Sequence, residues 1–500
     1  MLCFHKTRLS VGVVSLFFSS FVWGESVAIR SYDPSDPVFL HQFPDNIPIS
    51  KVRPFLKQEN AISQKVTLNR QQLALQPQLV KSVLISALIK NDVETVEFLL
   101  PLYQQQEDAD SFLLTWSNAV VNKFTGNLNQ SISDYRRLIA IQPESLPIRL
   151  QLAIALYENQ DNTAALDQFE KLRSESLSPP FARLISQYQH YLQQRDQWDI
   201  YGYVSYLYDP NVNNAPKQGK TYKNWRPTQT AEKANGTGYG LTLKKRWSLP
   251  KGFFSHTNFD LNGKYYWDNK KYNEIQSRLD VGFGYRSGAI EIELSPFVEQ
   301  FWYAYGDSEN ASNKGTLHRY FHSLGVNQQF SYWITPNWQW QTKIEFTQYY
   351  YTQRKNLNGK SIDLLSQFLY RPNINQYWLV GANYYRKQAQ VSYNSFTREA
   401  ILAAWGQEWL GGISSRLQIS YANRRYHGAI LDKKNSFLPE FYFVPQKNKE
   451  YSLSLSLWHR AVHFWGITPR IIWSYQKTDS NNSFSNYDKN RIYFDFTKTF

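Results

Sequence analysis

The second half of the chain alternates between apolar and polar residues with a period of two. Residues 451–458 read Tyr-Ser-Leu-Ser-Leu-Ser-Leu-Trp, so Tyr451 and the three leucines share one face while the serines share the other. A β-strand places successive side chains on opposite faces, whereas a helix does not. This stretch is therefore predicted to be a strand with one apolar and one polar surface.

Similar segments follow one another from Trp198 to Phe500, and fourteen of them can be counted. Their lengths, near ten residues, suit the tilted strands of a membrane barrel. The predicted strands are about 198–208, 238–247, 256–267, 275–286, 289–301, 318–332, 338–351, 361–370, 377–387, 397–408, 412–425, 449–460, 466–477 and 491–500.

The connections between these segments alternate between long and short. The long ones include 209–237, 302–317 and 426–448, and the short ones include 287–288, 334–337 and 371–373. Bacterial outer-membrane barrels have an even number of antiparallel strands, long external loops and short periplasmic turns. Residues 198–500 are therefore predicted to form such a barrel, with its C-terminus in the periplasm.

Charged residues fall on the polar face of the predicted strands. A charge at the middle of the lipid layer costs roughly 2 to 4 kcal/mol, so this face should line the lumen. One interpretation is a conductive or substrate-guiding wall, and the more ordinary one is that the charges pair and stabilise a hydrated interior. The candidate lumen-lining residues are Lys244, Glu291, Glu293, Arg416, Arg470 and Arg491.

The region before the barrel has helical spacing and a repeat of 34 residues, the period of the tetratricopeptide helix pair. The matched positions are Ala119 with Ala153, Ser131 with Ala165, Tyr135 with Phe169, and Leu138 with Leu172. Residues 61–197 are predicted to form an all-α domain of such repeats, with a generic helical bundle as the alternative. Tyr135 and Phe169 are interpreted as core residues, and Tyr157 is left as a possible client contact.

The N-terminus carries a short basic start followed by an apolar run that ends at Gly24. Residues 1–24 are predicted to be a secretory signal peptide, and the proline-containing residues 25–60 an extended arm. The one cysteine, Cys3, lies in the signal peptide. The mature chain is therefore expected to lack disulfides and thiolate metal ligands.

Composition narrows the class of protein further. A hydrophobic content of 42% and a mean hydropathy of −0.54 exclude a helical membrane protein. The formal charge of +14 is not gathered into any recognisable nucleic-acid module, so no nucleic-acid partner is expected. Aromatic residues are frequent, and tryptophans beside the predicted short turns are interpreted as a girdle at the lipid headgroups. They are Trp333, Trp338, Trp340, Trp458 and Trp465.

No catalytic or cofactor motif is present. The sequence has no nucleophile elbow, phosphate-binding glycine loop or HExxH segment. The pairs His318/His322 and His459/His463 have a spacing that holds a metal only on a helix, whereas both fall in predicted strands or turns. The chain is therefore expected to be neither an enzyme nor a metalloprotein, and to bind no cofactor.

The signal peptide, the tetratricopeptide region and the barrel beginning Trp198-Asp199-Ile200-Tyr201-Gly202-Tyr203 together resemble the surface lipoprotein assembly modulators, the Slam family. This resemblance covers nearly the whole chain and implies an outer-membrane translocator. Its clients would be lipoproteins, or related secreted proteins that bind haem or iron, carried from the periplasm to the cell surface. A route through the lumen and a lateral seam between the first and last strands both stay open.

Other functions compatible with a barrel are a passive porin-like channel with an accessory periplasmic domain, an outer-membrane enzyme, and an adhesin or receptor. Expected partners are a client protein, outer-membrane lipids and a periplasmic chaperone. The last strand, with Phe496 and a terminal Phe500, resembles the signal read by the barrel-assembly machinery.

Overall fold

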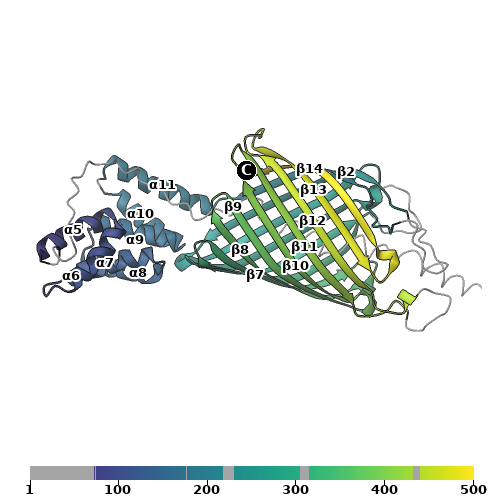
Figure 1. Ribbon diagram of the computed structural model, residues 1–500, viewed down its shortest axis with the longest axis horizontal. Helices are drawn as coiled ribbons and strands as arrows, with labels where there is room; N and C mark the ends of the chain where they lie inside the picture. Colours follow the sequence, from purple (N-terminus) through teal and green to yellow (C-terminus); the bar gives the residue numbers. More distant parts are fainter. Residues whose placement is uncertain are drawn as a thin grey trace, which may run out of the picture.

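The computed structural model describes residues 73, 75–175, 177–217, 230–304, 315–431 and 440–499. The predicted signal peptide, the proline-rich arm and Phe500 lie outside these residues. The described part forms a helical domain followed by a barrel, and Figure 1 shows the helices beyond one end of the tilted strands. No described helix combines the length and apolar content needed to cross a membrane.

The helical domain contains seven helices among the described residues: α5 (Pro77–Lys90), α6 (Val93–Gln104), α7 (Ser111–Phe124), α8 (Leu128–Ile141), α9 (Leu146–Glu158), α10 (Asn162–Arg173) and α11 (Pro179–Arg195). The residues matched by the 34-residue offset are all 0 or 1% exposed, so they form the core as predicted. Ser131 also joins the two helices of its pair, because its hydroxyl donates to the Ala119 carbonyl at 2.7 Å. The turn between them is made by Gly126, whose φ of +89° favours glycine.

The barrel closes from fourteen antiparallel strands, as predicted, with each strand paired to its neighbours in the sequence and β1 paired to β14. The strands are β1 (Asp199–Asp209), β2 (Ala234–Ser248), β3 (Phe253–Tyr266), β4 (Glu274–Arg286), β5 (Ile290–Tyr303), β6 (His318–Thr335), β7 (Trp338–Tyr351), β8 (Gly359–Asn373), β9 (Gln376–Ala389), β10 (Phe396–Glu408), β11 (Ile413–Tyr426), β12 (Lys447–His459), β13 (Ile467–Ser480) and β14 (Tyr487–Thr499).

Most strands extend beyond their predicted ranges, and β6, predicted at 318–332, spans 18 residues. The ladder continues through segments such as 236–237, which lack apolar alternation but still pair with both neighbours. Backbone hydrogen bonds do not depend on side-chain polarity, so the sequence pattern marks only part of each strand. The turn predicted at 371–373 was misplaced for this reason: β8 continues to Asn373 through a register shift after Tyr370.

The two ends of the barrel differ in their connections. One end has short turns such as 249–252, 287–289 and 374–375, and is called the short-turn end. The opposite, long-loop end carries the connections 210–233, 304–317 and 427–446. The helical domain enters β1 at the short-turn end.

Candidate functional site

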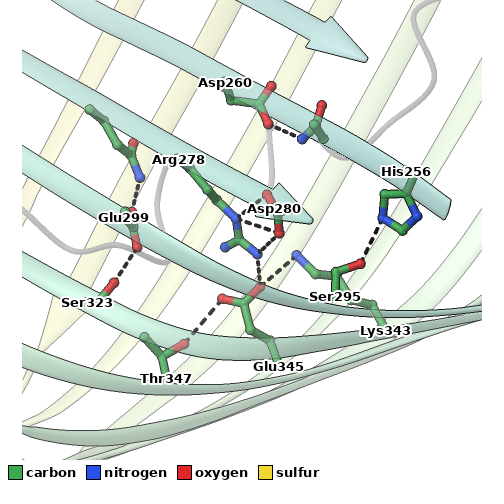
Figure 2. Close-up of polar contacts among 12 residues, drawn as sticks. His256, Asp260, Arg278, Asp280, Ser295, Glu299, Ser323, Lys343, Glu345 and Thr347 are labelled. Atoms are coloured by element: carbon green, nitrogen blue, oxygen red, sulfur yellow. Dashed lines mark hydrogen bonds and ion pairs between the residues drawn. The ribbon is translucent and has the colours of Figure 1, made fainter. Parts of the chain in front are cut away.

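Charged side chains meet across the inside of the barrel. Arg278 of β4 lies 3.0 Å from the carboxylate of Glu345 on β7, and 2.8 Å from that of Asp280 on its own strand. Two strands separate β4 from β7 in the barrel. On the convex outer surface such side chains would diverge, so the contact places this face of both strands on the lumen. Figure 2 shows the network, in which Lys343 also lies 3.2 Å from Glu345.

Large apolar side chains occupy the opposite face. Phe283 and Leu294 alternate with inward-facing residues of β4 and β5 and are 68% and 54% exposed. A lipid-facing exterior and a charged interior are the arrangement of an outer-membrane barrel. The alternation read from the sequence therefore assigned the two faces of these strands correctly.

The predicted lumen residues occur in separate clusters rather than in one wall. Glu291 and Glu293 of β5 lie 3.0 and 3.1 Å from the guanidinium of Arg246 on β2, again across the inside. Lys244 shares the face of Arg246 but is exposed near the short-turn end.

The remaining predicted residues lie elsewhere on the inner wall. Arg470 and Arg416 are buried, and their guanidinium carbons lie 5.0 and 6.0 Å from the centre of the Trp458 ring. Arg491 lies 3.3 Å from the carboxylate of Asp209 at the long-loop end.

Trp458 corrects the prediction of an outer aromatic girdle at that turn. It lies on the same face of β12 as Ser454 and Ser456, which are 4% and 8% exposed, and its partners across the two ladders are Ser414 and Arg470. The ring therefore faces the lumen and stacks near arginines. Its position next to a short turn does not tell which face of the strand it lies on. The serines do, because Trp458 is an even number of residues away from each of them and so lies on their face.

An aromatic cluster inside the long-loop end was not predicted. Phe321 packs against Phe301 and Tyr349 with ring centres 5.4 and 5.5 Å apart. Tyr351 accepts a hydrogen bond from Lys387 at 2.8 Å. Tyr349 shares the face of Glu345, so the cluster lines the interior. The run Tyr349-Tyr350-Tyr351 was a signal for it. Three consecutive tyrosines show no alternation, however, so the sequence did not tell which of them face the lumen.

The helical domain is bound to the short-turn end by polar contacts. Asn162 donates to the Ser248 hydroxyl at 2.8 Å, and Asp161 accepts from the Lys251 amide at 3.1 Å. Asn159 accepts from the Gly288 amide at 3.2 Å, which adds a second barrel turn. Asp196, just after α11, accepts from the Ser248 hydroxyl at 2.7 Å. The α9–α10 turn, the start of α10 and the end of α11 therefore hold the domain against two adjacent hairpins.

Tyr157 was left as a possible client contact, and the structure places it in the core instead. Its side chain is 3% exposed and packs edge-to-face on Tyr188, with ring centres 4.9 Å apart. The guanidinium carbon of Arg195 lies 4.0 Å from the centre of the Tyr157 ring. Burial lowers the pKa of Arg195. In this conformation Tyr157 joins α9 to α11 and presents no surface to a client.

No group of three or more His, Cys, Asp or Glu side chains is placed to hold a metal ion within the described ranges. The ionic clusters instead pair arginine or lysine with carboxylates. The paired charges can line a hydrated passage through the barrel, and the contacts at the short-turn end can hold the helical domain at its mouth.

Comparison with known proteins covers both parts of the chain. Residues 198–500 match the family model described as surface lipoprotein assembly modifier, and residues 66–169 match the model of its N-terminal TPR repeats. A surface lipoprotein assembly modifier of Pasteurella multocida is 47% identical over 482 residues, which cover 96% of this chain and 94% of the relative. Surface lipoprotein assembly modifier 1 of Haemophilus influenzae is 40% identical over 97% of both chains. The hemophilin secretion modulator of Acinetobacter baumannii is 21% identical, over 86% of this chain and 88% of the relative.

Proposed function

This chain belongs to the surface lipoprotein assembly modifier family, and from that premise we propose that it delivers lipoproteins from the periplasm to the cell surface. It is an outer-membrane β-barrel with a helical repeat domain. The observation that carries the proposal is that a helical repeat domain is docked at the mouth of the barrel, where Asp161, Asn162 and Asp196 hold it by hydrogen bonds.

The helical domain lies in the periplasm in this proposal, and the long loops lie outside the cell. Short turns face the periplasm in bacterial barrels, and the helices contact two of those turns. Tetratricopeptide repeats stack into concave surfaces that bind peptides. The domain would receive the client, or a periplasmic chaperone that carries it, directly at the barrel mouth.

A passive channel is the first competing function. A diffusion pore has no need of a repeat domain fixed at its entrance. The pair Arg278–Glu345 shows that charges on the inner wall are paired with one another. An adhesin or receptor would use the long loops alone, so it does not account for the docked helices. The role proposed is accordingly a non-enzymatic one without a cofactor.

Secreted haem-binding proteins are a second class of client. The relative from Acinetobacter baumannii bears the name hemophilin secretion modulator, and it aligns with most of this chain. Assembly of the barrel itself would require the barrel-assembly machinery, with Phe496 of β14 and Phe500 as part of the signal that it reads.

The test is a comparison of surface proteins in cells with and without the gene. Intact cells are treated with an external protease, and the released lipoprotein peptides are compared by mass spectrometry. At least one lipoprotein should lose surface exposure in the deletion strain while its total amount persists, and the full chain should restore it. An unchanged set of surface lipoproteins would reject the proposal.

A second test uses a variant in which the contacts between the helical domain and the barrel are weakened, together with a matched control. The double variant Asp161→Ala/Asn162→Ala removes two hydrogen bonds to the hairpin at 248–251 and leaves those between Asp196 and Ser248. It should fold and reach the outer membrane but restore surface exposure poorly. The exposed pair Asp167–Lys171 lies on the same helix, so Asp167→Ala/Lys171→Ala should restore it fully.

A further inference from the structure

The barrel closes where β1 meets β14, and the two strands separate before they end. Toward the long-loop end, their ladder stops at the pair Tyr206–Phe494. β1 nevertheless continues to Asp209 in register with β2, and β14 begins at Tyr487 in register with β13. Among the described residues, β1 and β14 form six pairs with each other, whereas β1 forms eleven with β2 and β14 forms twelve with β13.

Side-chain contacts replace the ladder in this upper part of the seam. The carboxylate of Asp209, 4% exposed, lies 3.2 Å from Lys489 and 3.3 Å from Arg491. Lys217 of the first long loop lies 2.6 Å from Asp488. Ion pairs between side chains break and re-form without changing the backbone of either strand. The group of Asp209, Lys489 and Arg491 is called the seam latch.

A cavity of about 470 Å³ lies beside the seam latch. It is bounded by Pro210, Asn211 and Ala215 of the first long loop and by Asp488, Lys489 and Asn490 of β14. Lys489 belongs to the inward face, because it contacts Asp209, and its two neighbours alternate to the outward face. The cavity thus lies at the wall of the barrel, where the two strands have parted.

The environments on the two sides of this wall are opposite in polarity. The outward side chains next to the seam, Tyr206, Ile492 and Phe494, are 42%, 58% and 46% exposed, as lipid-facing residues are. The inside carries ion pairs such as Arg278–Glu345. A polypeptide can cross a hydrated, charged lumen. Each methylene of an acyl chain, by contrast, has a higher free energy there than in the lipid bilayer.

We propose that the upper β1–β14 seam is the site where the lipid anchor of the client passes from the barrel into the outer leaflet, with the ion pairs of the seam latch bridging the parted strands at rest. This inference rests on the proposed function, which supplies the lipidated client and the orientation. With the long loops outside the cell, the parted stretch lies at the level of the outer leaflet. The client polypeptide uses the lumen, and its acyl chains leave sideways.

The test joins the seam covalently. Val204 and Phe496 are paired in the ladder and both face outward, so Val204→Cys/Phe496→Cys allows a disulfide across the seam. Ile471→Cys/Phe494→Cys is the matched control, since this outward pair joins β13 to β14 instead. The one native cysteine, Cys3, lies in the predicted signal peptide. The probe is the lipoprotein identified by the surface comparison above, in its natural form and with its lipidated cysteine replaced.

Oxidation of the seam pair should abolish surface exposure of the lipidated client and leave passage of the unlipidated form unchanged. Reduction should restore the lipidated client, which shows that the variant is folded. The control pair should have no effect in either state. Normal exposure of the lipidated client in a fully oxidised seam overturns the inference, and so does an equal block of both forms. If neither the reduced variant nor the wild-type chain exposes any client, the proposed function is rejected instead.

The seam latch has its own readout. Asp209→Asn removes the charge that holds Lys489 and Arg491, so the seam should part more often and its cysteine pair should oxidise more slowly. The rate for the β13–β14 control pair should stay the same. An unchanged rate at the seam would show that Asp209 does not hold it closed.

Discussion

The guanidinium of Arg195 lies 4.0 Å above the ring of Tyr157, and its Nη1 donates to the carbonyl of that residue at 3.2 Å. The same nitrogen donates to Asn162 at 2.6 Å, and Asn162 in turn donates to Ser248 of the barrel at 2.8 Å. Arg195 therefore links three parts of the molecule: helix α11, the core of the helical domain, and the β2–β3 hairpin of the barrel.

Replacing Arg195 should loosen the docking without unfolding the helices. Arg195→Ala removes a cation–π contact and two hydrogen bonds, together worth about 1 to 3 kcal/mol. Hydrogen exchange should become faster at the amides of Ser248 and Lys251, which donate to Asp196 and Asp161. Mass spectrometry of peptides from this hairpin provides the measurement.

Two comparisons make the Arg195 result specific. Arg195→Lys keeps the charge but loses the planar fork, and should give an intermediate rate. Lys171→Ala, in an exposed ion pair on α10, should leave the hairpin unchanged. Equal exchange in the wild type and Arg195→Ala would show that the arginine does not transmit the docking.

The ion pair across the lumen should contribute strongly to barrel stability. Arg278→Ala leaves the buried carboxylate of Asp280 without its cation and Glu345 with Lys343 alone, which should cost about 3 kcal/mol or more. The measurement is the temperature at which the folded barrel loses its characteristic mobility in electrophoresis. Lys477→Ala breaks an exposed pair with Asp479 and should leave this temperature almost unchanged, because water screens the pair. A similar effect of both variants would contradict the structural role of Arg278.

Phe496 should matter more for assembly in cells than for the stability of the finished barrel. It is 44% exposed on the outer face, so its loss removes little packing. Phe496→Ala should reduce the folded fraction in outer membranes while refolding in detergent stays normal. Phe346→Ala, outward on β7 and 55% exposed, is the matched control. If both variants lower the folded fraction equally, Phe496 carries no special signal.

Acidification should loosen the end of the first long loop. Burial alone would raise the pKa of Glu232, but hydrogen bonds from Asn269 and Lys271 outweigh it and hold the pKa below its ordinary value of 4.5. A lowered carboxyl pKa stabilises the fold above the ordinary value, and the effect disappears as the pH falls through the lowered one. Hydrogen exchange of residues 230–235, corrected for the intrinsic rate at each pH, should therefore increase below about pH 4.5.

Glu232→Gln provides the comparison for this pH effect. It should exchange faster than the wild type at neutral pH, because the ion pair with Lys271 is lost. The difference should vanish in acid, where the wild-type carboxyl is protonated. A difference that persists at low pH would assign the protection to another group.

Patterns with a fixed period were sufficient to predict much of the fold. The alternation of serine and leucine at 452–457 placed β12 and its two faces correctly, because a strand has only two faces. The 34-residue offset placed Tyr135 and Phe169 in the core, since equivalent positions in stacked repeats contact equivalent neighbours. Both predictions needed only local geometry.

Residues whose role depends on a neighbour distant in the sequence could not be predicted in the same way. Tyr157, for example, is buried because α11 folds back over α9 and brings Tyr188 and Arg195 onto its ring. The lumen charges of the candidate site were recognised as a set. Their division into clusters depends on which strands face each other across the barrel.

The sequence by itself determined the two domains, the fourteen strands and the polarity of the faces described above, because periodic patterns of apolar residues specify secondary structure and burial. Only the tertiary structure decided how the chain closes on itself. The short β1–β14 ladder, the contact of Asp209 with Lys489, and the docking of α10 on the β2–β3 hairpin each join residues separated by about 90 to 300 positions. Such contacts depend on the stagger of the strands and the path of the helices, which no local pattern encodes.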